Sequence, residues 1–323
     1  MNICFYNNHP YWGGLANNGG SRTILKSCEA LRKLGHHTCV VAPVDYFTWF
    51  KHDAPVKKIP KDTDLAIAVS ISDIELMLDR LPDHVMAAYW ARPFETWQMS
   101  EKKCLKAMRL LDDFGGKVIC NSQWQTDFLR KNDIEATTVY AGMDFDQWQP
   151  PHRRDSTSTT VGFLVHSHPR KRFKDTRKLI KLVSRTSANV QWVGFGDLST
   201  INRKELGGLR CDQSNFRFFE SPSHDTLLKI YQQCHYFFAP TEFEGFHNPP
   251  AEAALCGCGI ICMDHPRNGC MDYCNIRSTS VERVASLLSN PHHHGINITP
   301  MLNLHNKVGS RERNMQKLVE VLS

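Results

Sequence analysis

Short apolar runs alternate with segments of helical periodicity along the whole chain. In the first half, apolar runs predict strands at residues 2–6, 38–42, 65–69, 85–90, 117–121 and 137–141. Ser21 is expected to cap a helix whose apolar face carries Ile24, Leu25, Cys28, Leu31 and Leu34, and another helix is predicted at 123–131. Strands that alternate with helices indicate a parallel, doubly wound sheet.

The same alternation begins again in the second half. Strands are predicted at 161–165, 190–193, 216–219, 236–238 and 260–263, and helices at 175–183, 225–233, 251–256 and 312–322. Between the halves, residues 149–160 are rich in proline, then in charge, then in serine and threonine, which is typical of a linker. We therefore predict an α/β protein of two Rossmann-like domains, residues 1–150 and 151–304, facing across a cleft, with a final segment at 305–323.

Composition agrees with this organisation. The chain has 323 residues, 41% hydrophobic and 22% charged, which suits about two domains of 100–200 residues. No apolar run approaches the roughly 20 residues that span a bilayer, and no leader pattern precedes the first strand. Many of the twelve cysteines lie inside apolar segments, as expected for core thiols of a cytoplasmic protein. In the Cys256–Cys274 group only Cys270 and Cys274 have the spacing of a zinc knuckle, and the run His292-His293-His294 is expected to be a solvated loop, so we do not expect a zinc site.

The most informative segment is 242–257, which includes two glutamates, Glu244 and Glu252, separated by seven residues. Its sequence predicts a strand end, a glycine turn, an Asn248 cap and a short helix that begins with prolines. Unpaired N–H groups at such a helix start form a binding site for an anion. The two carboxylates suit sugar hydroxyls better than phosphate. A capped helix with an acidic residue that favours the helix dipole is the structural alternative.

This segment resembles the E-x7-E motif of the retaining glycosyltransferases of family 4, which have the glycosyltransferase B fold. The resemblance implies that Glu252 binds ribose hydroxyls and that Glu244, as a catalytic residue, binds a hydroxyl of the donor sugar. It places the amides of Gly245, Phe246 and His247, with Asn248 beside them, near the donor sugar and diphosphate. The first domain would then hold the acceptor and the second the nucleotide sugar, and the final helix would pack back on the first domain.

Two further segments resemble parts of the same family. The loop 17–22 resembles its N-terminal Gly-Gly loop, in which Gly19 and Gly20 let the backbone approach the donor phosphate. The basic run after strand 161–165 resembles its Arg-x4-Lys pair, which neutralises the diphosphate. The spacing is imperfect, because Pro169 stands five residues before Lys174. We expect Lys174 to be the catalytic lysine, and Arg170 or Arg172 to supply the arginine; a solvated basic helix start is the alternative.

The acceptor side is less defined. Family members often carry a histidine after a first-domain strand, whereas residues 88–97 of this chain contain none. Trp90, Arg92 and Glu95 are candidates for an acceptor pocket, with Trp97 nearby. A buried ion pair of Arg92 and Glu95 between stacked tryptophans is an equal alternative. No cofactor or metal is expected, although 144–146 and 62–64 each read Asp-x-Asp.

Two other functions stay open at this point. The expected partners are a nucleotide sugar and a glycan or lipid-linked sugar acceptor. The net charge of +6 and the aromatic loops also fit DNA modification, in which a sugar is transferred to a hydroxymethylated base and Arg153 and Arg154 track phosphates. A non-catalytic protein that binds nucleotide sugars or nucleic acid is the third possibility.

Overall fold

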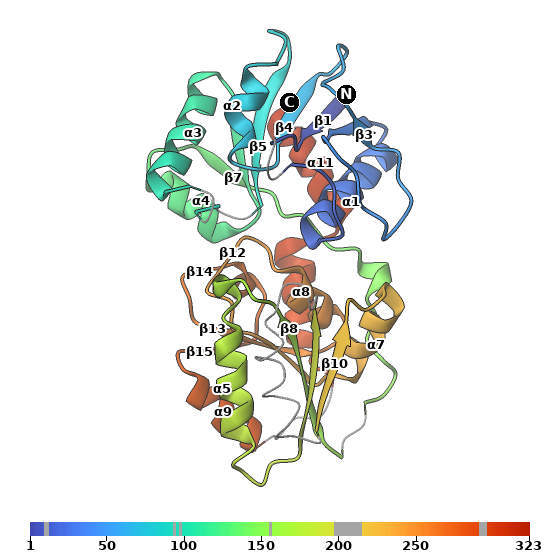
Figure 1. Cartoon of the computed structure of the whole chain (residues 1–323), viewed down its shortest axis with the longest axis vertical. Coiled ribbons are helices and arrows are strands. Elements are labelled where there is room, and N and C mark those ends of the chain that lie inside the picture. The colour runs from blue at the N-terminus through green and yellow to red at the C-terminus, as the bar shows by residue number, and fades with distance from the viewer. Residues whose placement is uncertain (10–12, 93–94, 97–98, 155–156, 197–214, 291–295) are drawn as a thin grey trace. The chain divides into compact units, whose positions relative to one another are not determined.

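The computed structural model describes residues 1–9, 13–92, 95–96, 99–154, 157–196, 215–290 and 296–323. The chain forms two compact units (Figure 1): unit 1 comprises Met1–Met143 and Gly309–Ser323, and unit 2 comprises Asp144–Val308. The sequence-based divisions at 150/151 and 304/305 lie close to these bounds. The predictions about Trp97 and His292–His294 fall outside the described residues.

Unit 1 is built on a seven-stranded parallel sheet in the order β3-β2-β1-β4-β5-β6-β7. Its strands are β1 Asn2–Tyr6, β2 His37–Val41, β3 Pro55–Val56, β4 Leu65–Ala68, β5 Met86–Ala91, β6 Lys117–Cys120 and β7 Ala136–Thr138. The apolar runs of the sequence become its central strands, because helices cover both faces of a doubly wound parallel sheet. β1 pairs in register with β2 and β4, so that Ile3 lies between Thr38 and Leu65.

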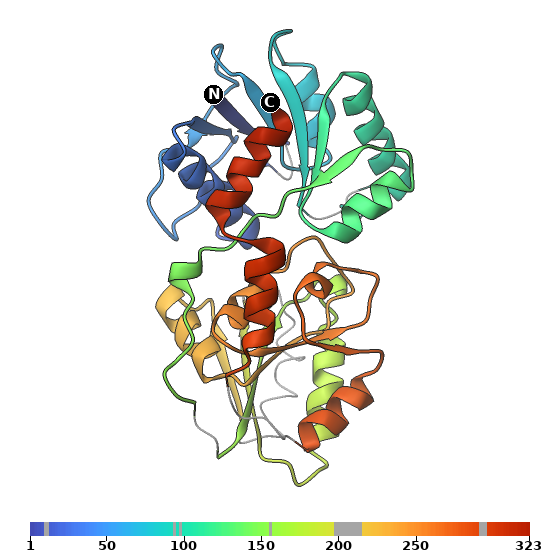
Figure 2. The same cartoon turned by 180° about the vertical axis from the view of Figure 1, so that it is seen from behind.

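The helices of unit 1 are α1 Gly19–Lys33, α2 Asp73–Leu78, α3 Glu101–Asp113, α4 Gln123–Arg130 and α11 Arg311–Leu322. The final helix, α11, lies against the sheet of unit 1, beside α1 (Figure 2). Its Met315, Leu318 and Leu322 are buried in one cluster with Leu25 and Phe5. Two distant parts of the sequence therefore share this core.

The start of α1 differs from the prediction. Asn18, not Ser21, is the capping residue: its side chain accepts a hydrogen bond from the N–H of Ser21 at 2.8 Å. The helix consequently begins at Gly19. Asn18 and Ser21 are both residues that cap helices, and the earlier one, Asn18, satisfies the orphan N–H group of Ser21 itself.

Unit 2 is built on a six-stranded parallel sheet in the order β10-β9-β8-β11-β13-β15, with a separate pair β12-β14. Its strands are β8 Thr159–Val165, β9 Val190–Gly196, β10 Phe216–Glu220, β11 Tyr236–Ala239, β12 Phe243–Glu244, β13 Gly259–Met263, β14 Arg267–Asn268 and β15 Ile276–Ser278. The two large parallel sheets confirm the predicted α/β class with two Rossmann-like domains.

Helices and short turns surround the sheet of unit 2. The α-helices are α5 Phe173–Val183, α7 His224–Gln233, α8 Asn248–Leu255, α9 Val281–Ser289 and α10 Ile298–Asn303, and the short turns are η1 Phe145–Gln147, η2 Pro169–Lys171, η4 Gly269–Asp272 and η5 Leu304–Val308. α5 and α9 pack side by side (Figure 1) and bury Leu179, Val183 and Leu288 against the strands. In the described part of the chain, every helix is too short or too polar to cross a membrane.

Candidate functional site

Two loops meet at the carboxyl edge of the unit 2 sheet. One follows β8 and leads through η2 into α5, and the other follows β11 and leads through β12 into α8. Parallel strands end at the same edge, where ligands of doubly wound folds bind. The N–H of Glu242 donates to the carbonyl oxygen of Arg170 at 2.9 Å, which joins the two loops.

The carboxylate of Glu244 lies at the centre of this junction. Its side chain is 8% exposed, Nη1 of Arg170 lies 2.8 Å from Oε2, and Nζ of Lys171 contacts Oε1. Burial alone would raise the pKa of Glu244, but Arg170 and Lys171 lower it to about 2. Glu244 is therefore ionised at neutral pH, and its two cationic partners leave one net positive charge in the group.

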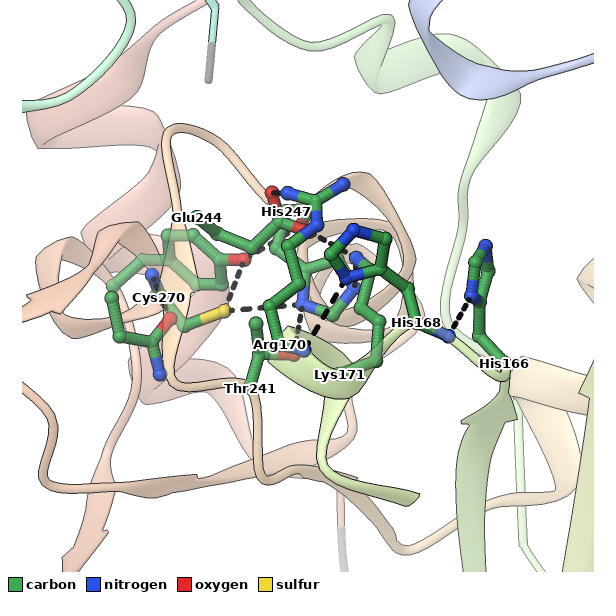
Figure 3. Close-up of polar contacts among 10 residues, drawn as sticks. His166, His168, Arg170, Lys171, Thr241, Glu244, His247 and Cys270 are labelled. Carbon is green, nitrogen blue, oxygen red and sulfur yellow. Dashed lines mark hydrogen bonds and ion pairs between the residues drawn. The ribbon is translucent and has the colours of Figure 1, made fainter. Parts of the chain in front are cut away.

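Lys171 also contacts His247, whose side chain is buried at the start of α8 (Figure 3). Nζ of Lys171 lies 3.0 Å from Nε2 of His247, while Nδ1 of His247 lies 3.4 Å from Oγ1 of Thr241 and 3.6 Å from Sγ of Cys270. Burial, followed by the charge of Lys171, holds the pKa of His247 well below its usual value. The imidazole is therefore neutral.

The lysine beside Glu244 is Lys171, whereas the sequence favoured Lys174. The loop after β8 tightens into η2, and Arg172 then adopts a left-handed conformation with φ of 51° before α5 begins. This turn directs Lys171 toward Glu244 and leaves Lys174 exposed as the second residue of α5. A left-handed arginine has no recognisable sequence signal, since this region favours glycine.

Arg170 and Arg172 have different partners. Arg170 binds Glu244, whereas Arg172 binds Asp175 at 2.6 Å and Glu242 at 3.0 Å. Arg172 thus connects the start of α5 to the loop after β11. It supports the site rather than lining it.

Glu252 lies inside α8 and is buried. Its Oε2 accepts a hydrogen bond from the hydroxyl of Tyr231, on α7, at 3.0 Å. The seven-residue spacing from Glu244 thus places one carboxylate in the loop and the other on the helix that follows it. Arg170 and Lys171 hold the carboxylate of Glu244, and Tyr231 holds that of Glu252, so the oxygens of both are oriented in the ligand-free protein.

The start of α8 offers fewer backbone donors than the sequence argument assumed. His247 is the N-cap and Asn248 the first helical residue, so that Pro249 and Pro250 occupy the next two positions. Proline has no N–H group, and the first turn of the helix therefore contributes only the amide of Asn248. The remaining amides are those of Gly245, Phe246 and His247 in the loop.

The loop of residues 245–247 packs against η4 and against Tyr273, the residue that follows η4. The ring of Phe246 packs 5.7 Å from that of Tyr273, whose hydroxyl donates to the carbonyl oxygen of His247 at 2.8 Å. A Cβ atom at Gly269 would meet the carbonyl oxygen of Gly245 at 1.5 Å, so no other residue fits there. Close backbone contact therefore fixes the shape of the loop.

The residues predicted for the acceptor pocket, and the two glycines predicted to approach the donor phosphate, belong to unit 1. Gly19 and Gly20 are exposed at the start of α1, after the carboxyl end of β1. Arg92 follows β5, and its guanidinium donates to the carbonyl oxygens of Gly20 at 2.8 Å and Val69 at 2.9 Å. Arg92 thus ties the glycine segment to the end of β4.

Trp90 and Glu95 are both buried. Trp90 packs in the core, and its indole N–H donates to the carbonyl oxygen of Val139 at 3.3 Å, so it presents no surface to an acceptor. Glu95 accepts hydrogen bonds from the N–H of Ile71 and from Oγ of Ser70 at 3.2 Å. Nearby, burial raises the pKa of Asp73 to about 7, so that this carboxyl group can exchange a proton near neutrality.

Two observations concern the metal and DNA alternatives raised from the sequence. Among the described residues, no group of three or more His, Cys, Asp or Glu side chains is arranged to hold a metal ion. Arg154, which the DNA alternative needs on the surface, is buried and donates to the carbonyl oxygens of Gly257 at 2.6 Å and Gln232 at 3.1 Å. It joins the ends of α7 and α8.

Sequence reasoning missed several side chains of the site. His166 and His168 follow β8 directly, and Thr241 and Cys270 contact the buried ring of His247. A pair of histidines just after an apolar run was a readable signal. The contacts of Thr241 and Cys270 depend on three loops coming together, which no local pattern indicates.

Solved structures share this architecture. Sucrose-phosphate synthase from Thermosynechococcus elongatus aligns with a TM-score of 0.74 at 14% identity, over 99% of this chain and 98% of that one. HepE from Anabaena, in complex with UDP and glucose, aligns with a TM-score of 0.74 at 13% identity, over 100% and 99%. AviGT4, a glycosyltransferase involved in avilamycin A biosynthesis, aligns with a TM-score of 0.66 at 12% identity, over 99% and 96%.

These likenesses show that the chain has the glycosyltransferase B fold. No protein-family model matches the sequence. No curated protein matches it either.

Proposed function

We propose that this chain is a glycosyltransferase that moves a sugar from a nucleoside-diphosphate sugar to an acceptor hydroxyl, with retention of the anomeric configuration. One observation carries the proposal: the loop after β8 and the loop after β11 bring two cations to Glu244, seven residues before the buried Glu252. In this fold, HepE has been solved with UDP-glucose. In this proposal, the two glutamates bind the sugar and the ribose of the donor, and the two cations bind its diphosphate.

The two glutamates bind the hydroxyl groups of the donor. Glu244 is ionised, as its low pKa requires, and accepts a hydrogen bond from a hydroxyl of the transferred sugar. Glu252 accepts from the ribose, with Tyr231 holding its other oxygen in place. Ionised carboxylates that accept from hydroxyls form short, strong hydrogen bonds, which orient the sugar.

Arg170 and Lys171 bind the diphosphate. In the ligand-free protein they neutralise Glu244, and donor binding supplies them with phosphate oxygens as additional partners. When the glycosidic bond breaks, negative charge grows on the leaving diphosphate, and fixed cations stabilise that charge. The amides of Gly245, Phe246, His247 and Asn248 donate to the same group, so the reaction needs no divalent cation.

The anomeric configuration is retained because the acceptor hydroxyl attacks the sugar on the same face from which the diphosphate departs. The acceptor hydroxyl approaches beside the departing phosphate, which takes its proton. Glu244 then positions the sugar and does not attack it. The acceptor is a glycan or a lipid-linked sugar, and the segment around Gly20 and Arg92 contributes to its binding.

A thermal-shift screen tests the donor site. UDP, GDP, ADP, CDP, dTDP and their common sugars are added to the parent protein and to Glu252→Ala. A ligand at 100 times its Kd stabilises the fold by about 2.7 kcal/mol, a shift of several degrees. We expect one nucleotide to stabilise the parent and not Glu252→Ala. The matched control is Glu220→Ala, which removes an exposed carboxylate of unit 2.

The outcomes separate the steps of the proposal. If no nucleotide shifts the midpoint of the parent, the donor assignment is wrong. If the product sugar has inverted configuration by NMR, the stereochemical assignment is wrong although transfer stands. Activity that disappears with EDTA and returns with a divalent cation would contradict the metal-free mechanism.

A further inference from the structure

Two histidines after β8 form the same side-chain-to-backbone hydrogen bond twice in succession (Figure 3). Nδ1 of His166 accepts the N–H of His168 at 3.0 Å, and Nδ1 of His168 accepts the N–H of Arg170 at 3.3 Å. A neutral imidazole that accepts at Nδ1 carries its proton on Nε2. The turn of residues 166–170, which these two hydrogen bonds define, therefore fixes both rings in one tautomer, with Nε2–H as a donor.

His166 occupies the position in this turn that is nearest to β8. Its side chain is half-buried, and within the described residues its Nε2 has no hydrogen-bond partner. The turn continues through His168 to Arg170, whose guanidinium binds Glu244. A donor at His166 and the cations of η2 thus lie on one short segment at the carboxyl edge of the sheet.

The charges that face His166 come from two elements. Arg170, Lys171 and His168 belong to its own segment, while Glu244 and His247 belong to the loop after β11. Burial, followed by Lys171 and Arg170, lowers the pKa of His166 to about 4, and the charge of Glu244 opposes this. Both geometry and charge therefore keep the ring neutral at pH 7.

Protonation would also break the turn. A second proton must go to Nδ1, where it would face the N–H of His168 and remove the acceptor of that hydrogen bond. The ring consequently offers a hydrogen bond without a change of charge. Neutral donors of this kind suit an anion that is already paired with cations, here Arg170 and Lys171.

We propose that His166 binds a phosphate oxygen of the donor diphosphate through Nε2–H, as a neutral donor whose tautomer the backbone of His168 fixes. This inference rests on the proposed function and adds a residue to its donor site. His168 is a positioning residue, since it repeats the turn and holds the backbone of Arg170.

Two substitutions of His166 separate the role of its Nε2–H group from the role of Nδ1 in the turn. In His166→Asn, the amide oxygen replaces Nδ1 and keeps the hydrogen bond to His168, but the Nε2 donor is lost. In His166→Gln, the terminal amide reaches the position of Nε2 and keeps a donor there, but the turn is lost. Titration calorimetry with UDP-glucose and the other nucleotide sugars of the screen as probes gives the Kd of each variant.

We expect His166→Asn to bind about tenfold more weakly than the parent, which corresponds to about 1.4 kcal/mol, and His166→Gln to remain within about threefold. The reverse order, with Asn like the parent and Gln weakened, would show that the ring serves the turn alone and would overturn the inference. His84→Asn, an exposed histidine of unit 1, is the matched control and should bind like the parent.

A second measurement tests the neutral state. Nucleotide sugars carry no group that titrates near pH 7, so binding heats in PIPES and in Tris report protons taken up by the protein. We expect net uptake below about 0.2 proton. Uptake of about one proton would mean that the ring becomes imidazolium and would overturn the neutral-donor inference. A parent protein that binds no nucleotide sugar would instead overturn the proposed function, and this inference with it.

Discussion

Nζ of Lys171 lies 3.0 Å from Nε2 of His247 and also contacts the carboxylate of Glu244. An ammonium group can only donate, so Nε2 must accept and the proton of the imidazole is on Nδ1. There it faces Thr241 and Cys270. The lysine is therefore held between one ionised and one neutral acceptor.

Replacing Lys171 should cost more activity than replacing Lys174. Lys171→Met removes a cation beside the diphosphate, and we expect kcat/KM to fall about 100-fold. Lys174→Met, on the exposed face of α5, should change kcat/KM by less than about threefold. Steady-state kinetics with a saturating acceptor measures both. The opposite order would return the catalytic role to Lys174.

His247 should act on donor binding through Lys171. His247→Phe removes the acceptor of the lysine, and we expect the donor KM to rise about tenfold while kcat changes less. His247→Gln, which keeps a polar group near Nε2, should recover much of the loss. Equal losses in the two variants, accompanied by equal falls in Tm, would indicate a packing role alone.

Glu244→Gln should have opposite effects on two ligands. The neutral side chain releases Arg170 and Lys171 from their ion pairs, so UDP or the matching nucleoside diphosphate should bind about threefold to tenfold more tightly. Sugar transfer should fall about 100-fold, because the hydroxyl loses an ionised acceptor. Calorimetry with the nucleotide and a transfer assay measure the two effects. Weaker nucleotide binding would contradict the proposed competition.

Acid should destabilise the protein in two windows. The pKa of His166 is lowered from 6.5 to about 4, so only the unfolded chain binds this proton between these values, and stability falls as the pH drops from 6.5 to 4. The pKa of Glu244 is lowered from 4.5 to about 2, so its contribution is complete above 4.5 and is lost toward pH 2. Denaturant unfolding at pH 7.5, 6 and 5 tests the first window, and His166→Asn should flatten that slope.

The last helix should contribute strongly to unit 1. Leu318→Ala leaves a cavity in the cluster that α11 shares with α1 and β1, and we expect a loss of about 2–5 kcal/mol in the free energy of unfolding. The exposed Lys317→Ala on the same helix should change stability by less than about 0.5 kcal/mol. A loss below 1 kcal/mol for Leu318→Ala would show that unit 1 is stable without this contact.

The sequence predicted the fold better than the site. Fully apolar strands such as 65–69 and 260–263 are recognisable because parallel sheets bury both faces. The pair Glu244 and Glu252 was found from its spacing, and the prolines after Asn248 were visible but their missing N–H groups were not considered. Lys171 was not found, because a short turn and a left-handed Arg172 decide which lysine meets the carboxylate. Trp90 was a candidate for an acceptor pocket with a buried arrangement as an equal alternative, and the apolar strand that contains it favours burial.

The shared core of α1, β1 and α11 also determines when unit 1 can become complete during synthesis. Residues 309–323 leave the ribosome only after all of 144–308 has been translated. Until then, the nascent unit 1 lacks the side chains of Met315, Leu318 and Leu322 and leaves an apolar surface of α1 uncovered. Unit 2 can therefore fold before the core of unit 1 is complete, although unit 2 is translated later.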